Sequence, residues 1–213
     1  MAIDRKELLQ SPHFEGLGSF LYCRPGNGDW RPSYMLECFG GQVSVEVDES
    51  EVSNPPAAGT VFQIGGSIRH NGRNNTVSLV TSTKKQVGTS LEALSPEHFE
   101  QFARGLLIHG VGIVHAKDTA VVNRVTYNKA TLKCQGATHE FRKLSPEIYQ
   151  RIPMPGKYVR FDLGLSVREE KNITGQLVVF QMPSILSITA EEMALGTNPA
   201  PPKPAAPPLP PKA

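Results

Sequence analysis

A five-residue pattern occurs twice in this chain, and it restricts the possible folds more than any other sequence feature. It reads Leu36-Glu37-Cys38-Phe39-Gly40 at its first occurrence and Leu132-Lys133-Cys134-Gln135-Gly136 at its second, 96 residues later. The segments that follow keep the same order: an alternating run, a proline-rich loop ending at Gly59 or Gly156, and two further alternating runs. This shared order predicts an internal duplication, with two copies of one unit.

Within each copy, apolar and polar residues alternate in short runs separated by Gly, Pro and Asn, the pattern of half-buried antiparallel strands. We therefore expect a mainly β protein with about five strands in each copy. The strands of the first copy are expected near residues 18–24, 32–39, 42–48, 60–69 and 75–82. Those of the second copy are expected near 110–117, 121–134 (continuous or broken), 137–143, 157–167 and 173–182.

Two Ser-Pro-Glu triplets predict short helices, because serine caps a helix N-terminus and proline fits its first turn. The helix after Ser95 connects the copies, with Phe99, Phe102 and Leu106 spaced to pack on one face. The helix after Ser145 separates the third and fourth strands of the second copy, where the first copy is expected to have only a loop.

The C-terminal segment differs in composition from the rest of the chain. Beyond Thr197 nearly all residues are Pro, Ala and Lys, which predicts a disordered tail because little apolar surface is there to bury. The expected organisation is a β-barrel at 15–88, a helical connector at 89–107, a second β-barrel at 108–190 and the tail at 196–213.

Strand, strand, strand, helix or loop, strand, strand is the order of elements in the OB-fold, a small five-stranded barrel. In architecture the chain thus resembles a tandem OB-fold protein of the kind found among bacterial single-stranded DNA-binding proteins. The resemblance covers about residues 15–88 and 108–190 and implies binding of single-stranded nucleic acid. Those proteins carry an acidic tail tip, whereas this chain ends Leu209-Pro210-Pro211-Lys212-Ala213. The resemblance therefore does not imply that this chain recruits partners through its tail tip.

Composition points to a cytoplasmic protein. The three cysteines are too few and too scattered for a disulfide framework, which favours a reducing compartment. No apolar stretch approaches the roughly 18 residues of a spanning helix, so a membrane location is not expected. The net charge of +2 argues against a chain that coats nucleic acid along its whole surface, and any basic surface must be local.

Alternation separates the inward from the outward face of each strand. Leu36, Cys38, Leu132 and Cys134 form the expected inward set. The outward set of the first copy is Glu37, Phe39, Ser44, Glu46, Val61 and Gln63, and that of the second is Lys133, Gln135, Glu140, Arg142, Tyr158 and Arg160. Single-strand binders pair cations that follow the phosphates with aromatic rings that stack on bases, so Lys133, Arg142, Tyr158 and Arg160 are the main candidate binding residues. They are also compatible with an ordinary solvated strand face.

Further candidates in the first copy lie in or next to loops: Trp30, Arg69, Arg73, Lys84 and Lys85. Arg69 and Arg73 flank an Asn-Gly hairpin turn, where the loops of OB-like barrels reach their ligands. A solvated hairpin and a packed tryptophan are the alternatives.

No catalytic pattern is present, so an enzyme is not expected. The sequence contains neither common glycine-rich nucleotide motif. Cys134 and His139 supply only two ligands of the four that a structural zinc site needs, so neither a metal nor a cofactor is predicted.

The expected function is therefore non-enzymatic binding of single-stranded nucleic acid, with DNA favoured, through the second copy. The alternative is a protein-interaction adaptor whose β-barrels hold one partner while the tail recruits another, because Pro207-Pro208-Leu209-Pro210 matches the Pro-x-x-Pro form that SH3-type grooves bind.

Overall fold

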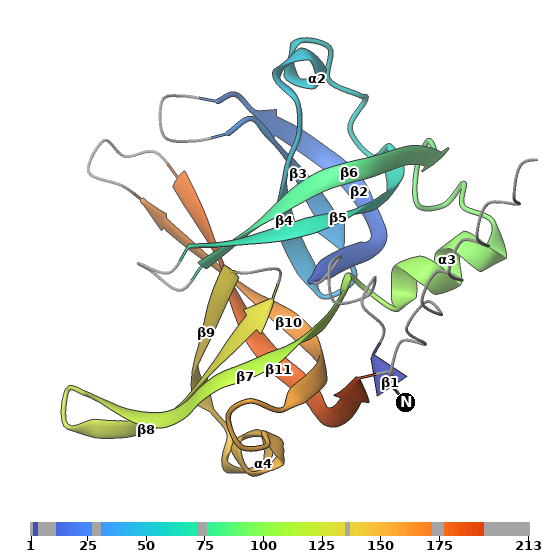
Figure 1. The fold of residues 1–213 in the computed structure, drawn as a ribbon. Coiled ribbons are helices and arrows are strands. Elements are labelled where there is room, and N and C mark those ends of the chain that lie inside the picture. Colours follow the sequence, from blue (N-terminus) through green and yellow to red (C-terminus); the bar gives the residue numbers. More distant parts are fainter. Residues whose placement is uncertain are drawn as a thin grey trace, which may run out of the picture.

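β-strands dominate the chain, as the alternating pattern predicts (Figure 1). The computed structural model describes residues 2–3, 12–26, 31–71, 76–134, 137–171 and 177–193. The first half contains β1 (Ala2–Ile3), β2 (His13–Arg24), β3 (Ser33–Cys38), β4 (Gly41–Glu46), α2 (Glu49–Ser53), β5 (Val61–Asn71) and β6 (Thr76–Gly88). After α3 (Pro96–Ala103), the second half contains β7 (Leu107–Val122), β8 (Val125–Cys134), β9 (Ala137–Leu144), α4 (Pro146–Arg151), β10 (Tyr158–Lys171) and β11 (Leu177–Met193). The tail predicted at 196–213 lies outside the described residues.

Five strands of the first half close into a ring. β3 pairs with β2 and β4, β6 pairs with β4 and β5, and β5 pairs back with β2. All of these pairings are antiparallel except that between β4 and β6, where Val45 lies opposite Leu79. Register shifts with the extra residues on β2 and β6 mark bulges, which bend strands and so allow a small sheet to close.

The second half repeats this order of elements but stays open on one side. Its strands follow one another as β9, β8, β7, β10 and β11. β9 and β11 come into contact, yet no backbone pairing joins them within the part of the chain that the structure describes. Both halves thus show three strands, a short helix and two strands, while the duplication itself stays a prediction.

The two halves share one sheet. Residues 13–15 of β2 pair antiparallel with residues 107–109 of β7, which links the ring of the first half to the strands of the second. One cluster of buried side chains extends through both halves, with Phe14 and Ile108 meeting at this junction. The chain therefore forms a continuous sheet rather than two units tied only by a helix.

Gln181 on β11 forms a second link between the halves. Its Oε1 accepts a hydrogen bond from the Ser44 N–H at 2.8 Å, and its Nε2 donates to the Ser44 carbonyl at 2.9 Å and to the Val77 carbonyl at 3.4 Å. Gln181 is 4% exposed, and Met35, which lies opposite Ser44 on β3, is completely buried. The outward face of β3 and β4 is thus covered in part by β11.

The predicted helix starts are present at both Ser-Pro-Glu triplets. The Ser95 side chain accepts a hydrogen bond from the His98 N–H, and the Ser145 side chain accepts one from the Ile148 N–H. Two expectations about helices were wrong. The first half has a helix, α2, where only a loop was expected, and Phe99 is 56% exposed on α3 instead of packing.

The inward set is buried as predicted, with Leu36, Cys38, Leu132 and Cys134 all at most 3% exposed. Burial raises the pKa of the Cys38 and Cys134 thiols to about 12, so neither is a nucleophilic thiolate at neutral pH. One outward assignment was wrong, because Val61 is completely buried. Val61 and Phe62 point to opposite sides of β5, and both are buried.

Several strand boundaries also differ from the expectation. The turn between the first two strands of the second half lies at residues 123–124, so the segment predicted as a strand over 121–134 contains the end of β7, a turn and β8. β11 continues to Met193, beyond the predicted end at residue 182, and its last residues pair with β1.

Candidate functional site

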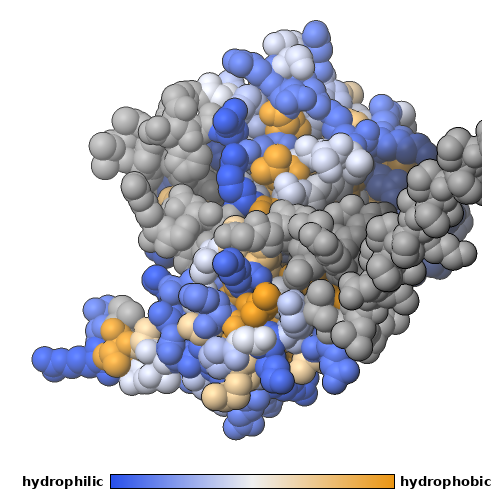
Figure 2. Space-filling model, viewed as in Figure 1, coloured by the Kyte–Doolittle hydropathy of each residue, from blue (hydrophilic) through white to orange (hydrophobic). Residues whose placement is uncertain are grey.

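The hairpin formed by β7 and β8 extends away from the rest of the second half (Figure 1). Its two turn residues, Asn123 and Arg124, have φ angles of 52° and 65°. Two consecutive positive φ angles form the type I′ turn that suits the twist of a two-residue hairpin, and asparagine adopts this conformation readily. Val121 and Val125 beside the turn are 69% and 50% exposed, and Figure 2 shows an apolar patch near the hairpin tip among hydrophilic residues.

The outward face of β8 and β9 carries a group of cations and a tyrosine. Because Ala130, Leu132 and Cys134 of β8 are buried, the odd-numbered residues of that strand point outward. On β9 the even-numbered residues point outward, since His139 and Phe141 are buried. We define the β8–β9 face by five residues: Tyr127, Lys129, Lys133, Arg142 and Lys143.

Lys133 and Tyr158, both predicted from the sequence, lie on the same side of the sheet. Lys133 is opposite Ile113 of β7, and Ile113 is opposite Tyr158 of β10. Residues that face each other across paired strands share a face, so the two side chains stand two strand spacings apart, about 10 Å. Lys133 is exposed, and Tyr158 is half-buried.

Arg142, also predicted, stands beside Lys129 and shares a carboxylate with it. Arg142 Nε donates to Glu140 Oε1 at 2.5 Å, and Lys129 Nζ lies 3.1 Å from Glu140 Oε2. Partial burial alone would raise the pKa of the Glu140 carboxyl, but the hydrogen bonds from Arg142 and Lys129 lower it overall. Glu140 therefore stays ionised and orients both cations, while competing with any other anion for them.

Lys143 joins the face through an unusual backbone conformation. Its φ of 57° ends the alternation of β9, so that Arg142 and Lys143 are both exposed. The Lys143 ammonium lies 5.5 Å from the centre of the Tyr127 ring, within the range of a cation–π contact. The sequence interpretation missed Tyr127, Lys129 and Lys143. Continuing the outward alternation of β8 backward from Lys133 identifies Lys129 and Tyr127, whereas nothing in the sequence indicates the left-handed Lys143.

The remaining predicted residue of the second half is Arg160, which lies two residues beyond Tyr158 on β10. It lies opposite Val111 on one side and Thr189 on the other. Its Nε is 3.8 Å from Glu191 Oε1, and its side chain is 35% exposed. Arg160 is thus partly engaged by an acid that is itself nearly buried.

Two predicted residues of the first half, Arg69 and Lys84, line one depression of about 420 Å³. Each is paired with an acid that also lines it, Arg69 with Glu46 and Lys84 with Glu51. The Lys84 ammonium also lies 4.6 Å from the centre of the Tyr34 ring, and burial lowers its pKa although Asp48 acts in the opposite direction.

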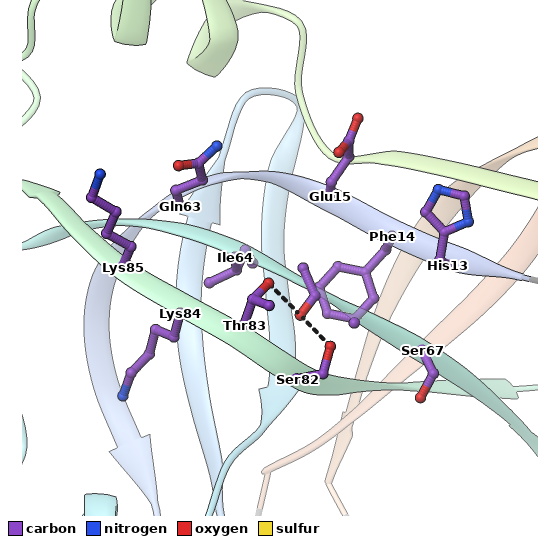
Figure 3. A pocket seen from close by; sticks show the side chains of 12 residues that line it. His13, Phe14, Glu15, Gln63, Ile64, Ser67, Ser82, Thr83, Lys84 and Lys85 are labelled. Carbon is purple, nitrogen blue, oxygen red and sulfur yellow. Dashed lines mark hydrogen bonds between the residues drawn. The ribbon is translucent and has the colours of Figure 1, made fainter. Parts of the chain in front are cut away.

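Lys85 is exposed on β6 and points away from Lys84 (Figure 3). Trp30 and Arg73 lie outside the described residues.

A Ser, a His and an Asp meet at the junction of the halves, but not in the arrangement of a nucleophile and its base. Asp162 Oδ1 lies 2.6 Å from His109 Nδ1, and Asp162 Oδ2 accepts a hydrogen bond from Ser187 Oγ at 2.6 Å. Partial burial raises the pKa of Asp162, yet the hydrogen bonds from Ser187 and His109 lower it overall. The serine contacts the carboxylate and not the imidazole, so the imidazole is not placed to activate it.

Two further features were searched for in the described part of the chain. Among those residues no group of three or more His, Cys, Asp or Glu side chains is placed to hold a metal ion. No helix in the ranges that the structure covers is long and apolar enough to span a membrane.

Comparison with known proteins gives a structural similarity without a sequence family. No protein-family model matches the chain, and no curated protein matches it. Among solved structures, the chain is similar to the wild-type single-stranded DNA-binding protein of Thermus aquaticus, with a TM-score of 0.46, 10% sequence identity and coverage of 86% of this chain and 94% of that chain. A deletion mutant of the same protein gives a TM-score of 0.45 and 10% identity over 90% of this chain and 97% of that chain. Both structures belong to the class of protein that the strand order suggested, and at this level of similarity they assign neither a function nor a binding residue to the chain.

Proposed function

We propose that this chain is a non-enzymatic binding protein for single-stranded nucleic acid, with DNA as the favoured ligand, and that it binds through the β8–β9 face. The observation that carries the proposal is that Lys129, Lys133, Arg142 and Lys143 lie on one side of two neighbouring strands, with the ring of Tyr127 next to the Lys143 ammonium. Asp118, opposite Lys129, and Glu140 are the acids that the register places among them.

The ligand class follows from the chemistry of these side chains. Cations at the spacing of adjacent strands bind consecutive phosphates, and an aromatic ring between them stacks on a base. Stacking requires a base that is free of a complementary strand, so the tyrosine favours a single strand over a duplex. Tyr158 and Lys133 both lie opposite Ile113, so Tyr158 places a second aromatic ring on this side of the sheet.

Binding is tested by fluorescence anisotropy of labelled oligo-dT at low salt, where the electrostatic contribution is largest. We expect the double variant Lys133→Glu, Arg142→Glu to weaken binding by about a hundredfold, because two attractive charges become repulsive. The matched control is Arg151→Glu in the last turn of α4, which reverses a charge of the same half away from the face.

We expect the control to change affinity by less than about threefold and the salt dependence of the double variant to be shallower than that of the wild type. Undetectable binding by the wild-type protein at low salt, or equal losses in the two variants, would overturn the proposal.

A further inference from the structure

The outward side of β2, β5 and β6 in the first half has a depression centred on Gly65 (Figure 3). Gly65 lies opposite Glu15 on β2 and opposite Thr83 on β6. Register partners, and residues two apart on one strand, share a face. A position without a side chain is therefore surrounded by side chains, those of His13, Glu15, Gln63, Thr83 and Lys85.

The floor of the depression includes the backbone of Gly65 and the hydroxyl of Thr83. A Cβ on Gly65 would lie 2.9 Å from Thr83 Oγ1. Thr83 Oγ1 and Ser82 Oγ donate to the Gly65 carbonyl at 3.3 and 3.4 Å. The depression has a volume of about 770 Å³, which is large enough for a planar ring.

The rim combines hydrogen-bonding groups of opposite kinds. Lys85 supplies a cation beside Gln63, its partner in the register, and Glu15 supplies a carboxylate next to the floor. Gln63 and Thr83 can each donate and accept. A planar ring with donors and acceptors along its edge, attached to an anionic group, fits this arrangement, and that is the chemistry of a nucleobase with its phosphate.

The depression lies on the same surface as the β8–β9 face. β10 pairs with both His109 and Ile113 of β7 along one edge of that strand. His13 and Lys133, which pair with the same two β7 residues, must therefore both lie along its other edge. Four residues of a strand separate these positions, about 13 Å. A strand bound at Lys133 can thus continue along β7 to His13 and the depression.

We propose that the depression holds one base of the single strand bound at the β8–β9 face, and that Glu15 makes it prefer bases with an exocyclic amino group. The proposal rests on the proposed function and extends it to base selectivity. A carboxylate accepts hydrogen bonds from the amino groups of cytosine, adenine and guanine, whereas thymine presents a carbonyl oxygen in place of cytosine's amino group.

The test compares labelled oligo-dC and oligo-dT of equal length at neutral pH, by anisotropy. A length of about 30 nucleotides is sufficient for contacts in both halves, since a single OB-like barrel covers about 4 to 16 nucleotides. We expect the wild-type protein to bind oligo-dC about threefold to tenfold more tightly than oligo-dT, the ratio given by one hydrogen bond.

We expect Glu15→Ala to reduce this ratio to about one. Glu15→Gln preserves the shape of the side chain and should give an intermediate ratio, because an amide both accepts and donates. Glu37→Ala on β3 removes the same charge outside the depression and should leave the ratio unchanged.

The ratio is informative because removing a negative charge strengthens the binding of both oligonucleotides equally. Equal binding of the two oligonucleotides by the wild type, or an unchanged preference in Glu15→Ala, overturns this inference while the proposed function stands. Failure to bind either oligonucleotide overturns the proposed function and this inference with it.

Discussion

The two halves of the chain have the same order of elements but use the outward side of their second and third strands differently. In the first half, Met35 is completely buried there, and Gln181 of the second half holds the backbone of Ser44. In the second half, Thr131, the counterpart of Met35, is also buried, but the same side carries exposed Lys133 and Arg142. The same strand order thus supports an internal contact in one half and an open cationic surface in the other.

The two halves also differ in net charge. Residues 1–95 contain two more acids than bases, whereas residues 96–190 contain four more bases than acids. On the outward side of β4, Glu46 is already paired with Arg69. The comparison teaches that a fold can be repeated without repeating a binding surface, because burial and charge are set residue by residue.

The largest expected effect is on stability, when Gln181 can no longer hydrogen-bond to the first half. We expect Gln181→Leu to lower the free energy of unfolding by about 2–4 kcal/mol, because it leaves the N–H and carbonyl of Ser44 and the carbonyl of Val77 without these hydrogen bonds. Urea denaturation measures this loss. Gln86→Leu on β6, where the glutamine is exposed, is the matched control with a change of less than about 0.5 kcal/mol. Similar losses in the two variants would show that β11 does not secure the first half.

The next largest effect is on oligo-dT affinity, and it compares one tyrosine from each half. We expect Tyr127→Ala to weaken oligo-dT binding by about fivefold to a hundredfold, which corresponds to the roughly 1–3 kcal/mol of one base stacked on an aromatic ring. Tyr127→Phe should retain most of the affinity. Tyr22→Ala is the counterpart in the first half, where the ring is 44% exposed on β2, and should change affinity by less than about twofold. Anisotropy titrations measure all three, and equal losses at Tyr127 and Tyr22 would remove the distinction between the halves.

A smaller effect of opposite sign is expected at Glu140. Replacing it by glutamine releases Arg142 and Lys129 from their shared carboxylate and removes a negative charge from the β8–β9 face. We expect Glu140→Gln to strengthen oligo-dT binding by about threefold at low salt. Glu37→Gln in the first half should have no such effect. Weaker binding by Glu140→Gln would mean that orienting the two cations matters more than the charge removed.

The same substitution should alter the dependence of stability on pH by about 0.2–1 kcal/mol. The pKa of the Glu140 carboxyl in the folded chain lies below its ordinary value of 4.5. Its contribution is therefore fully present above pH 4.5 and is lost as the pH falls through the lowered value. Urea denaturation should show wild type and Glu140→Gln converging as the pH falls below 4.5. A difference that persists unchanged in acid would contradict this assignment.

The alternation in the sequence predicted which strand residues point inward, and it also predicted part of the candidate site. Leu36 and Leu132 are buried as the alternation requires, and the same period places Lys133 outward. The prediction failed at Val61, which is buried on the outward side, and at the left-handed Lys143, the extra residue of a bulge on β9. Neither leaves a signal in a single sequence, because burial of an outward residue depends on distant segments and a bulge inserts one residue into an otherwise ordinary strand.

Local sequence thus determined the strands, their inward residues and the capped helix starts, because side-chain period and capping depend on neighbours in the chain. Only the tertiary structure decided which outward residues meet solvent. Ser44 and Gln181 are 137 residues apart, yet their contact covers one face, while the corresponding cations of the second half remain exposed. Pairing between distant strands depends on how both halves curve and close, so no local pattern contains it.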